Sequence, residues 1–485
     1  MCSGIIISAL LLMQLSSQAL ARDQAESFIQ ALITNNDLEN FVDQSELEIS
    51  SRLGIEYEGV DNKFLISYDI EDSIKNSIKR NELDYAFDIV NLEGNYSKIV
   101  LSVQELDYQK EFYFKGQRYI SPISYYTRDW KRLESKHFRF LISDTTLFNS
   151  YCINNLEDYL LKIDGLLNFG DKRLKELEAH KIYYLLCKDE EEIELLTAFY
   201  TRGMYNVAYD FIITTFNSHY HELLHLLINF KLKRLPLYTH PFFQEGFAVA
   251  YGGRGGKEPD AILSLGLFLY NSKMLDYSSL LSVRDFYQVN VSLTYPLSGL
   301  YHKFLVEQIG IEKYLELYQK YSGTPDEVEK MKIDVNELPD RATWHEFIDD
   351  YSQKKAIDFN NSNTQTQLIY DGASARISED LQNYYFNLRD TLLIGAHANS
   401  KGYHSKKFHE VFKNRKYQGE KYLIVANANE ISIYNLFTNN LIANYVSSFS
   451  DTHSPVPSED GLYCFSVRRH VFDAELKSIL MDKTD

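Results

Sequence analysis

Residues 221–225 read His-Glu-Leu-Leu-His inside an apolar run, and this spacing limits how the surrounding chain can fold. If the run is helical, His221 and His225 lie on one face, where both imidazoles can donate a nitrogen to the same metal ion. Glu222 is rotated from His221 by about 100° around the helix axis, so its carboxylate is placed beside the metal rather than on it. The pattern predicts a zinc site with a general base next to it.

A third metal ligand is expected from the apolar segment that follows. Glu245 stands in the run Phe-Phe-Gln-Glu-Gly-Phe-Ala, after a loop bounded by Pro236 and Pro241. Proline disrupts a helix interior but is favoured in a first helical turn, so these two residues predict the end of one helix and the start of another. The small residue Gly246 allows two helices to pack closely. We therefore expect Glu245 to complete a His-His-Glu set for Zn²⁺.

Together these segments resemble the gluzincin zinc peptidases, in which HExxH is followed on the next helix by a Glu, often within E-G-x-A. Residues 245–248 read Glu-Gly-Phe-Ala. The metzincin pattern is excluded, because Ile228 and Lys231 stand where it requires Gly and a third His. The resemblance covers about residues 130–355. It implies a thermolysin-like catalytic domain that hydrolyses peptide bonds, with Glu222 as the general base.

One departure from related aminopeptidases bears on the type of cleavage. Residues 203–206 read Gly-Met-Tyr-Asn and are similar to the G-x-M-E-N segment of those enzymes, but Tyr205 replaces the Glu that would hold a free amine. We therefore expect an endopeptidase rather than an aminopeptidase. The strand expected over residues 209–215 is interpreted as the sheet edge along which an extended peptide substrate adds by main-chain hydrogen bonds.

The oxyanion formed during peptide hydrolysis needs a hydrogen-bond donor besides the metal. Tyr295 lies 50 residues after Glu245 and just before a helix expected at residues 300–308. Many gluzincins have a Tyr at the corresponding place, so the resemblance implies this role for Tyr295. His302 is a second candidate, although its spacing equally suits a buried structural histidine.

Three other positions near the motif are left open by the sequence. His219 and His240 flank the two helices but lack ligand spacing. The thermolysin-like branch carries an Asp four residues after its Glu ligand to orient a histidine, and Val249 stands there in this chain. The partner that orients the zinc histidines is therefore open, with Asp210 as a candidate.

The chain is long enough for several domains, since it has 485 residues of which 45% are hydrophobic. Residues 22–129 predict helices followed by strands, an order that resembles NTF2-like domains. The last part alternates in hydrophobicity, with strands expected at residues 422–426, 431–437 and 441–446. We predict a multidomain α+β protein with a signal peptide at 1–21, an α+β domain at 22–129, a gluzincin domain at 130–358 and a β-rich domain at 359–485.

The first residues are typical of an exported protein. A short apolar run at residues 4–15 is followed by Ala19-Leu20-Ala21, the small-residue pattern of a signal-peptide cleavage site. The alternative is that the run forms a buried helix in an uncut chain. No later run is long and apolar enough to predict a transmembrane segment. We therefore expect an extracytoplasmic protein that is periplasmic, secreted or on the cell surface.

Charge and cysteine content narrow the function further. The net charge of -18 has the wrong sign for a protein that neutralises phosphates, so nucleic-acid binding is disfavoured and no nucleic-acid partner is expected. Cys152 and Cys187 could form a disulfide or could each be a small buried residue, and the sequence leaves both open.

The prediction is a zinc metallopeptidase acting on a peptide or protein substrate. Two alternatives use the same residues. A non-catalytic zinc domain could serve a surface or binding protein, although Glu222 would then be a buried charge with no bond to the metal. A zinc hydrolase acting on a non-peptide amide would need identical metal chemistry.

Overall fold

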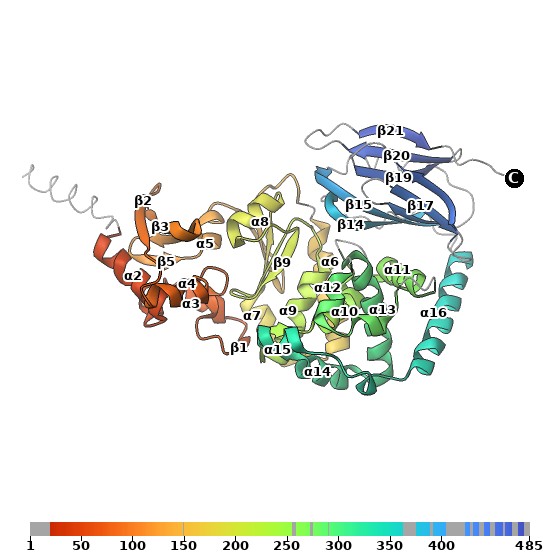
Figure 1. Ribbon diagram of the computed structural model, residues 1–485, viewed down its shortest axis with the longest axis horizontal. Helices are drawn as coiled ribbons and strands as arrows, with labels where there is room; N and C mark the ends of the chain where they lie inside the picture. The colour runs from red at the N-terminus through yellow and green to blue at the C-terminus, as the bar shows by residue number, and fades with distance from the viewer. Residues whose placement is uncertain are drawn as a thin grey trace, which may run out of the picture.

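The computed structural model describes residues 20–148, 150–254, 259–271, 275–289 and 291–361, and eight strands between residues 375 and 479. Within these residues the chain is a mixed α+β protein with several separate sheets. Figure 1 shows the N-terminal elements at one end, a sheet and a group of helices in the middle, and the C-terminal strands above α11 and α16. The α+β expectation is confirmed at this level.

The N-terminal part begins with helices and continues as an antiparallel meander. The helices are α2 (Arg22–Thr34), α3 (Gln44–Ser51) and α4 (Asp72–Lys79), with the short strand β1 (Glu56–Glu58) between α3 and α4. The meander has the order β2 (Ala86–Asn91), β3 (Tyr96–Val103), β4 (Tyr108–Lys115) and β5 (Arg118–Ile120). Side chains of β3 alternate between more and less buried, as expected for a strand with one covered face.

The last strand of the meander is short. β5 ends at Ile120, and Pro122–Tyr126 form the short helix α5. The side chain of Ser121 accepts a hydrogen bond from the main-chain N–H of Ser124, and Pro122 occupies the first turn. Ser and Pro are preferred at these positions of a helix start, so local capping ends the strand.

The central sheet has five strands in the order β6-β7-β8-β10-β9. β7, β8 and β10 are parallel, whereas β6 and β9 are antiparallel to their neighbours. Helices α6, α7 and α8 connect these strands along the chain. The strands are β6 (Lys131–Glu134), β7 (Phe138–Ile142), β8 (Ile182–Leu186), β9 (Gly203–Asn206) and β10 (Phe211–Thr214), and the helices are α6 (Tyr151–Leu167), α7 (Gly170–His180) and α8 (Glu190–Thr197).

The prediction that residues 209–215 form a sheet edge is wrong. β10 lies inside the sheet, with β8 on one side and β9 on the other, and all four of its side chains are buried. Strands covered on both faces are typical of such inner positions. The edge strand next to β10 is β9, which is joined to it through residues 207–210 and pairs with it in antiparallel orientation, while β6 forms the opposite edge.

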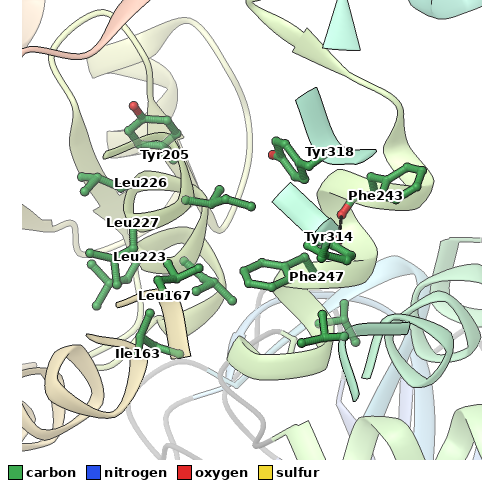
Figure 2. Close-up of a cluster of buried hydrophobic side chains, with 14 of the residues drawn as sticks. Ile163, Leu167, Tyr205, Leu223, Leu226, Leu227, Phe243, Phe247, Tyr314 and Tyr318 are labelled. Atoms are coloured by element: carbon green, nitrogen blue, oxygen red, sulfur yellow. Dashed lines mark hydrogen bonds between the residues drawn. The ribbon is translucent and has the colours of Figure 1, made fainter. Parts of the chain in front are cut away.

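Two helices that follow β10 pack closely against their neighbours. In Figure 2, Leu223 and Leu227 of α9 (Tyr220–Leu232) lie near Ile163 and Leu167 of α6. α10 (Pro241–Gly252) packs on α13 (Val291–Ile309), where a Cβ on Gly246 would come within 2.2 Å of the ring of His302. A residue larger than glycine would therefore separate these helices.

Five more helices of the α type are described in the chain after α10, besides α13. They are α11 (Pro259–Asn271), α12 (Val283–Gln288), α14 (Ile311–Lys320), α15 (Pro325–Lys330) and α16 (Arg341–Asn361). Figure 2 shows Phe247 of α10 beside Tyr314 of α14, whose hydroxyl donates a hydrogen bond of 3.2 Å to the carbonyl of Phe243. No helix among the described residues is long and apolar enough to cross a membrane.

Hydrophobic packing crosses the domain boundary predicted near residue 130. Leu53 and Tyr57 belong to the same buried cluster as the leucines of α9. Leu185 and Phe211 of the central sheet belong to the cluster formed by the N-terminal helices. β1 also pairs in parallel with β11 (Arg234–Pro236), directly after α9. Residues on both sides of residue 130 thus contribute to the same two hydrophobic clusters. The division into domains at 22–129 and 130–358 stays a prediction.

The C-terminal part contains antiparallel strands. The three strands expected there correspond to β16, β17 and β18, which form one sheet, while the hairpin β14–β15 was not predicted. The C-terminal strands are β14 (Ala375–Leu388), β15 (Thr391–Tyr403), β16 (Tyr422–Ala426), β17 (Glu430–Asn435), β18 (Leu441–Val446), β19 (Thr452–Ser458), β20 (Gly461–Val467) and β21 (Ala474–Ile479).

The predicted signal peptide lies outside the described residues except for its last two residues, and α2 begins directly after Ala21.

Candidate metal centre

Three side chains that can bind a metal converge between α9 and α10. The Oε2 atom of Glu245 lies 3.1 Å from Nε2 of His221 and 3.7 Å from Nε2 of His225. One potential ligand atom from each residue lies within 4.8 Å of the other two. The three side chains are between 8% and 13% exposed, so the cluster is largely shielded from water. The structure brings together the three residues predicted as ligands.

The close approach of the two helices is made possible by glycine at the end of α10. A Cβ on Gly252 would lie 2.9 Å from both the Cα and the main-chain nitrogen of His221. At the other end, Pro241 occupies the first turn of α10, and Nδ1 of His240 accepts a hydrogen bond of 3.2 Å from the N–H of Phe242. His240 therefore caps the helix that carries Glu245.

A main-chain carbonyl orients the first histidine. Nδ1 of His221 lies 2.8 Å from the carbonyl oxygen of Gly253. Because a carbonyl only accepts hydrogen bonds, Nδ1 carries a proton, and Nε2 is the nitrogen that faces Glu245. Asp210, the candidate for this orienting role, is bonded elsewhere: its carboxylate pairs with Lys63 and accepts a hydrogen bond from Tyr205. Of the candidates left open by the sequence, Asp210 is therefore not the partner that orients His221.

The donor set fits Zn²⁺. Two imidazole nitrogens and one carboxylate oxygen are ligands that zinc prefers, and a tetrahedral site with bonds of about 2.0–2.1 Å has ligand atoms about 3.3 Å apart. The distances of 3.1 and 3.7 Å lie on either side of that value. Burial raises the pKa of Glu245, but His225 and His221 outweigh it and hold the pKa below its usual range, so this carboxylate is ionised and available to a cation.

Glu222 lies beside this cluster without joining it. Its Oε2 accepts a hydrogen bond of 2.8 Å from the main-chain N–H of Tyr205 on the edge strand β9. Burial raises the pKa of Glu222 to about 7, with His221 opposing the shift and Glu245 adding to it. A carboxyl group with a pKa near neutrality can both take up and release a proton.

Tyr295 also lies at the site. Its ring is nearly parallel to that of His221, with 6.5 Å between centroids, and the guanidinium of Arg254 lies 4.5 Å from the Tyr295 ring centroid. Burial and the nearby Glu245 raise the pKa of Tyr295, so its hydroxyl keeps its proton. Tyr295 is within α13, which begins at Val291 and not near residue 300 as expected.

The other histidines have structural surroundings. His302 is fully buried, its Nδ1 lies 2.8 Å from the carbonyl oxygen of Ser298, and its ring packs on Phe242. It is therefore a core residue and no oxyanion donor. Nδ1 of His219 lies 2.8 Å from the hydroxyl of Thr214, which ties it to β10.

The sequence did not reveal the main-chain contacts of this site. The carbonyl of Gly253 and the N–H of Tyr205 are main-chain groups, which almost every residue type has. The type of residue at these positions therefore does not predict either contact. The pair Gly252-Gly253 at the end of the Glu245 helix is the one local feature that could have indicated a close contact.

Cys152 and Cys187 are both free and buried, in different hydrophobic clusters, which settles the open question of a disulfide between them.

No protein-family model, curated protein or solved structure matches this chain. Function must therefore be argued from the chemistry of the site.

Proposed function

We propose that this chain is a gluzincin-type zinc peptidase, with His221, His225 and Glu245 as ligands. The observation that carries the proposal is the convergence of these three donors beside a fourth group, Glu222 of α9, whose carboxylate accepts a hydrogen bond from the edge strand β9. Zn²⁺ held by these three residues would supply Lewis acidity, lowering the pKa of a nearby water molecule and polarising a substrate carbonyl.

Glu222 carries out the proton transfers of the proposed reaction, and Tyr295 stabilises the oxyanion. Glu222 takes a proton from the attacking water and passes it to the nitrogen of the leaving amine. Its raised pKa suits both steps, since a carboxyl group near pKa 7 exchanges protons readily at neutral pH. Tyr295 keeps its hydroxyl protonated and can donate a hydrogen bond to the developing oxyanion.

The edge strand β9 is the proposed binding place for an extended peptide. The N–H of Tyr205 bonds to Glu222 and therefore points away from the partner strand β10. Main-chain groups on that side of β9 face the catalytic residues, so a peptide added there lies next to Glu222. The side chain of Tyr205 is buried and bonded to Asp210, so it supplies no acid for a free amine. This supports an endopeptidase.

The wider organisation belongs to the same proposal. Residues 130–358 would form the gluzincin domain, flanked by an NTF2-like α+β domain and a β-rich domain. The parallel β7-β8-β10 core with an antiparallel edge strand beside the two metal helices supports it. The apolar leader at residues 1–21 is the support for an extracytoplasmic location.

The test compares Glu222→Gln with the parent chain and with Glu316→Gln, a matched change at an exposed residue of α14. Each zinc-loaded protein is incubated with a diverse peptide mixture, with and without chelator, and the products are sequenced. We expect internal cleavage by the parent chain and by Glu316→Gln, and none by Glu222→Gln, which keeps its zinc. Normal cleavage by Glu222→Gln would remove Glu222 from this role. A zinc-loaded parent chain that leaves the mixture intact would indicate a binding protein.

A further inference from the structure

The general base is held by a strand whose turn is anchored by residues from the N-terminal part of the chain. Tyr205 donates its main-chain N–H to Glu222, while its hydroxyl donates a hydrogen bond of 2.6 Å to Asp210. Both ends of Tyr205 are thus occupied, one at the catalytic carboxylate and the other in the protein interior. The position of Glu222 depends on where Tyr205 is held.

The hydrogen bonds around the Tyr205 hydroxyl have a single possible direction. An ionised carboxylate only accepts, so Tyr205 donates to Asp210 and must accept from the hydroxyl of Tyr57, at 2.8 Å. Tyr57 in turn accepts from the side-chain amide of Asn229, at 3.2 Å. The chain of donors runs from Asn229 through Tyr57 and Tyr205 to Asp210.

A buried ion pair fixes the acceptor end of this chain. Nζ of Lys63 lies 2.7 Å from Oδ2 of Asp210, whose side chain is fully buried. Lys63 also donates to the carbonyl oxygens of Ser50 and Ile55, at 3.3 and 3.0 Å, so its three protons all have acceptors. A buried network in which every donor has an acceptor is rigid, so it fixes the position of the Asp210 carboxylate.

The main chain of the same turn is held by a second N-terminal residue. Asp210 has a φ of 52°, a left-handed conformation that is unfavourable for an Asp without support. The guanidinium of Arg52 donates to the carbonyl oxygens of Tyr209 and Asp210. Arg52, Tyr57 and Lys63 therefore clamp the β9–β10 turn from outside the central sheet.

The network also reaches the metal helix. Asn229 lies one turn after His225 on α9, and Tyr57 belongs to β1, which pairs with β11 directly after that helix. We propose that Tyr205, held by Tyr57 and by the Lys63–Asp210 pair, is a positioning residue that sets the place of Glu222 relative to the zinc ligands. This inference rests on the proposed peptidase function.

The experiment measures kcat, KM, bound zinc and melting temperature for Tyr205→Phe in the full chain. This change keeps the main-chain N–H that binds Glu222 but removes the hydroxyl group that anchors the Tyr205 side chain to Asp210. We expect kcat to fall by about tenfold to 100-fold, as for other residues that orient catalytic groups. KM should change by less than about twofold and zinc content should not change, because neither substrate contacts nor ligands are removed.

Tyr68→Phe is the matched control. Tyr68 is also buried, and its hydroxyl donates one hydrogen bond of 2.9 Å to the carbonyl of Leu196, in the cluster of the N-terminal helices. It should lower the melting temperature without lowering kcat. Tyr57→Phe removes one donor to Tyr205 and should lower kcat by about threefold, which keeps a readout if Tyr205→Phe does not fold.

Each outcome separates this inference from the peptidase proposal. A parent chain without peptidase activity overturns the proposed function and the inference together. An active parent chain with unchanged kcat in Tyr205→Phe, or in Tyr57→Phe where the first variant does not fold, overturns the inference alone. Loss of zinc in Tyr205→Phe, or an equal fall of kcat in Tyr68→Phe, would also overturn it by showing a purely structural role.

Discussion

The carbonyl oxygen of Gly253 accepts the Nδ1 proton of His221 over 2.8 Å, and this contact links the end of one metal helix to the start of the other. It selects the tautomer whose Nε2 can bind a cation. The contact exists because α10 ends in Gly252, where α9 passes within 2.9 Å of the place a Cβ would occupy. Ligand geometry and helix packing therefore depend on the same two glycines.

Gly252→Ala should weaken zinc binding. The added methyl group would meet the main chain of His221, so the helices must separate and the bond between His221 and Gly253 must lengthen. We expect the zinc dissociation constant to rise by about tenfold to 100-fold and the free energy of unfolding to fall by about 1–3 kcal/mol. Competition with a zinc-binding dye and urea denaturation measure the two effects.

Gly165→Ala is the control for this change. Gly165 lies in α6, and a Cβ there would have no atom within 4 Å. Alanine is favoured over glycine inside a helix by about 0.5–1 kcal/mol, so this variant should be more stable and should bind zinc normally. Equal zinc affinity in both variants would contradict the close-packing argument.

Tyr295→Phe should lower kcat by at least about tenfold with little change in KM, since an oxyanion donor acts in the transition state. The ring is expected to keep its place, because its contacts with His221 and Arg254 do not involve the hydroxyl. Tyr119→Phe serves as the control: its hydroxyl is buried without a hydrogen-bond partner among the N-terminal helices. If both variants keep the parent kcat, Tyr295 is a packing residue.

Removing zinc should lower the melting temperature of the parent chain, and adding zinc should restore it. A ligand that binds only the folded state at a free concentration of about 1,000 times its dissociation constant contributes about 4 kcal/mol. Glu245→Gln should lose this zinc-dependent shift, because it replaces an ionised ligand by a neutral amide. Glu222→Gln should keep the shift. Differential scanning fluorimetry with and without zinc distinguishes the two carboxylates, and a shift that survives in Glu245→Gln would exclude Glu245 as a ligand.

The grouping of the three candidate metal ligands could be predicted because their relationship is local. The spacing of His221 and His225 is one helical turn, and Glu245 follows on the next helix after two prolines, so periodicity and helix-boundary signals were enough. Tyr295 was placed through a family resemblance, although the helix around it begins earlier than expected.

Pairing between distant segments was not predictable in the same way. β9 and β10 are both short, and nothing local in their residues decides which one lies at the sheet edge. Lys63 and Arg52 are separated from Asp210 by about 150 residues of chain. Hydrophobic periodicity reports only local structure, so it cannot predict contacts between such distant residues. Asp210, which the sequence left open as a candidate for orienting a histidine, is instead bonded to Lys63 from a distant part of the chain.

His240 should make the protein less stable in acid. Burial lowers the pKa of His240 to about 4, so the unfolded chain binds a proton below pH 6.5 that the folded chain does not take up until about pH 4. Stability from this group is present above pH 6.5 and is lost as the pH falls, by about 3 kcal/mol over this window. The neighbouring His302, whose pKa burial lowers to about 3, acts in the same direction.

His240→Asn isolates this contribution. Asparagine can still accept the hydrogen bond from the N–H of Phe242 and is a favourable helix cap, but it does not titrate. Urea denaturation in chelator between pH 7.5 and 4.5 removes zinc release from the comparison. We expect the free energy of unfolding to fall less steeply with acid in the variant than in the parent chain, with the difference appearing below pH 6.5. Parallel curves would show that His240 takes up its proton equally well in the folded and unfolded chain, contrary to its burial at the start of α10.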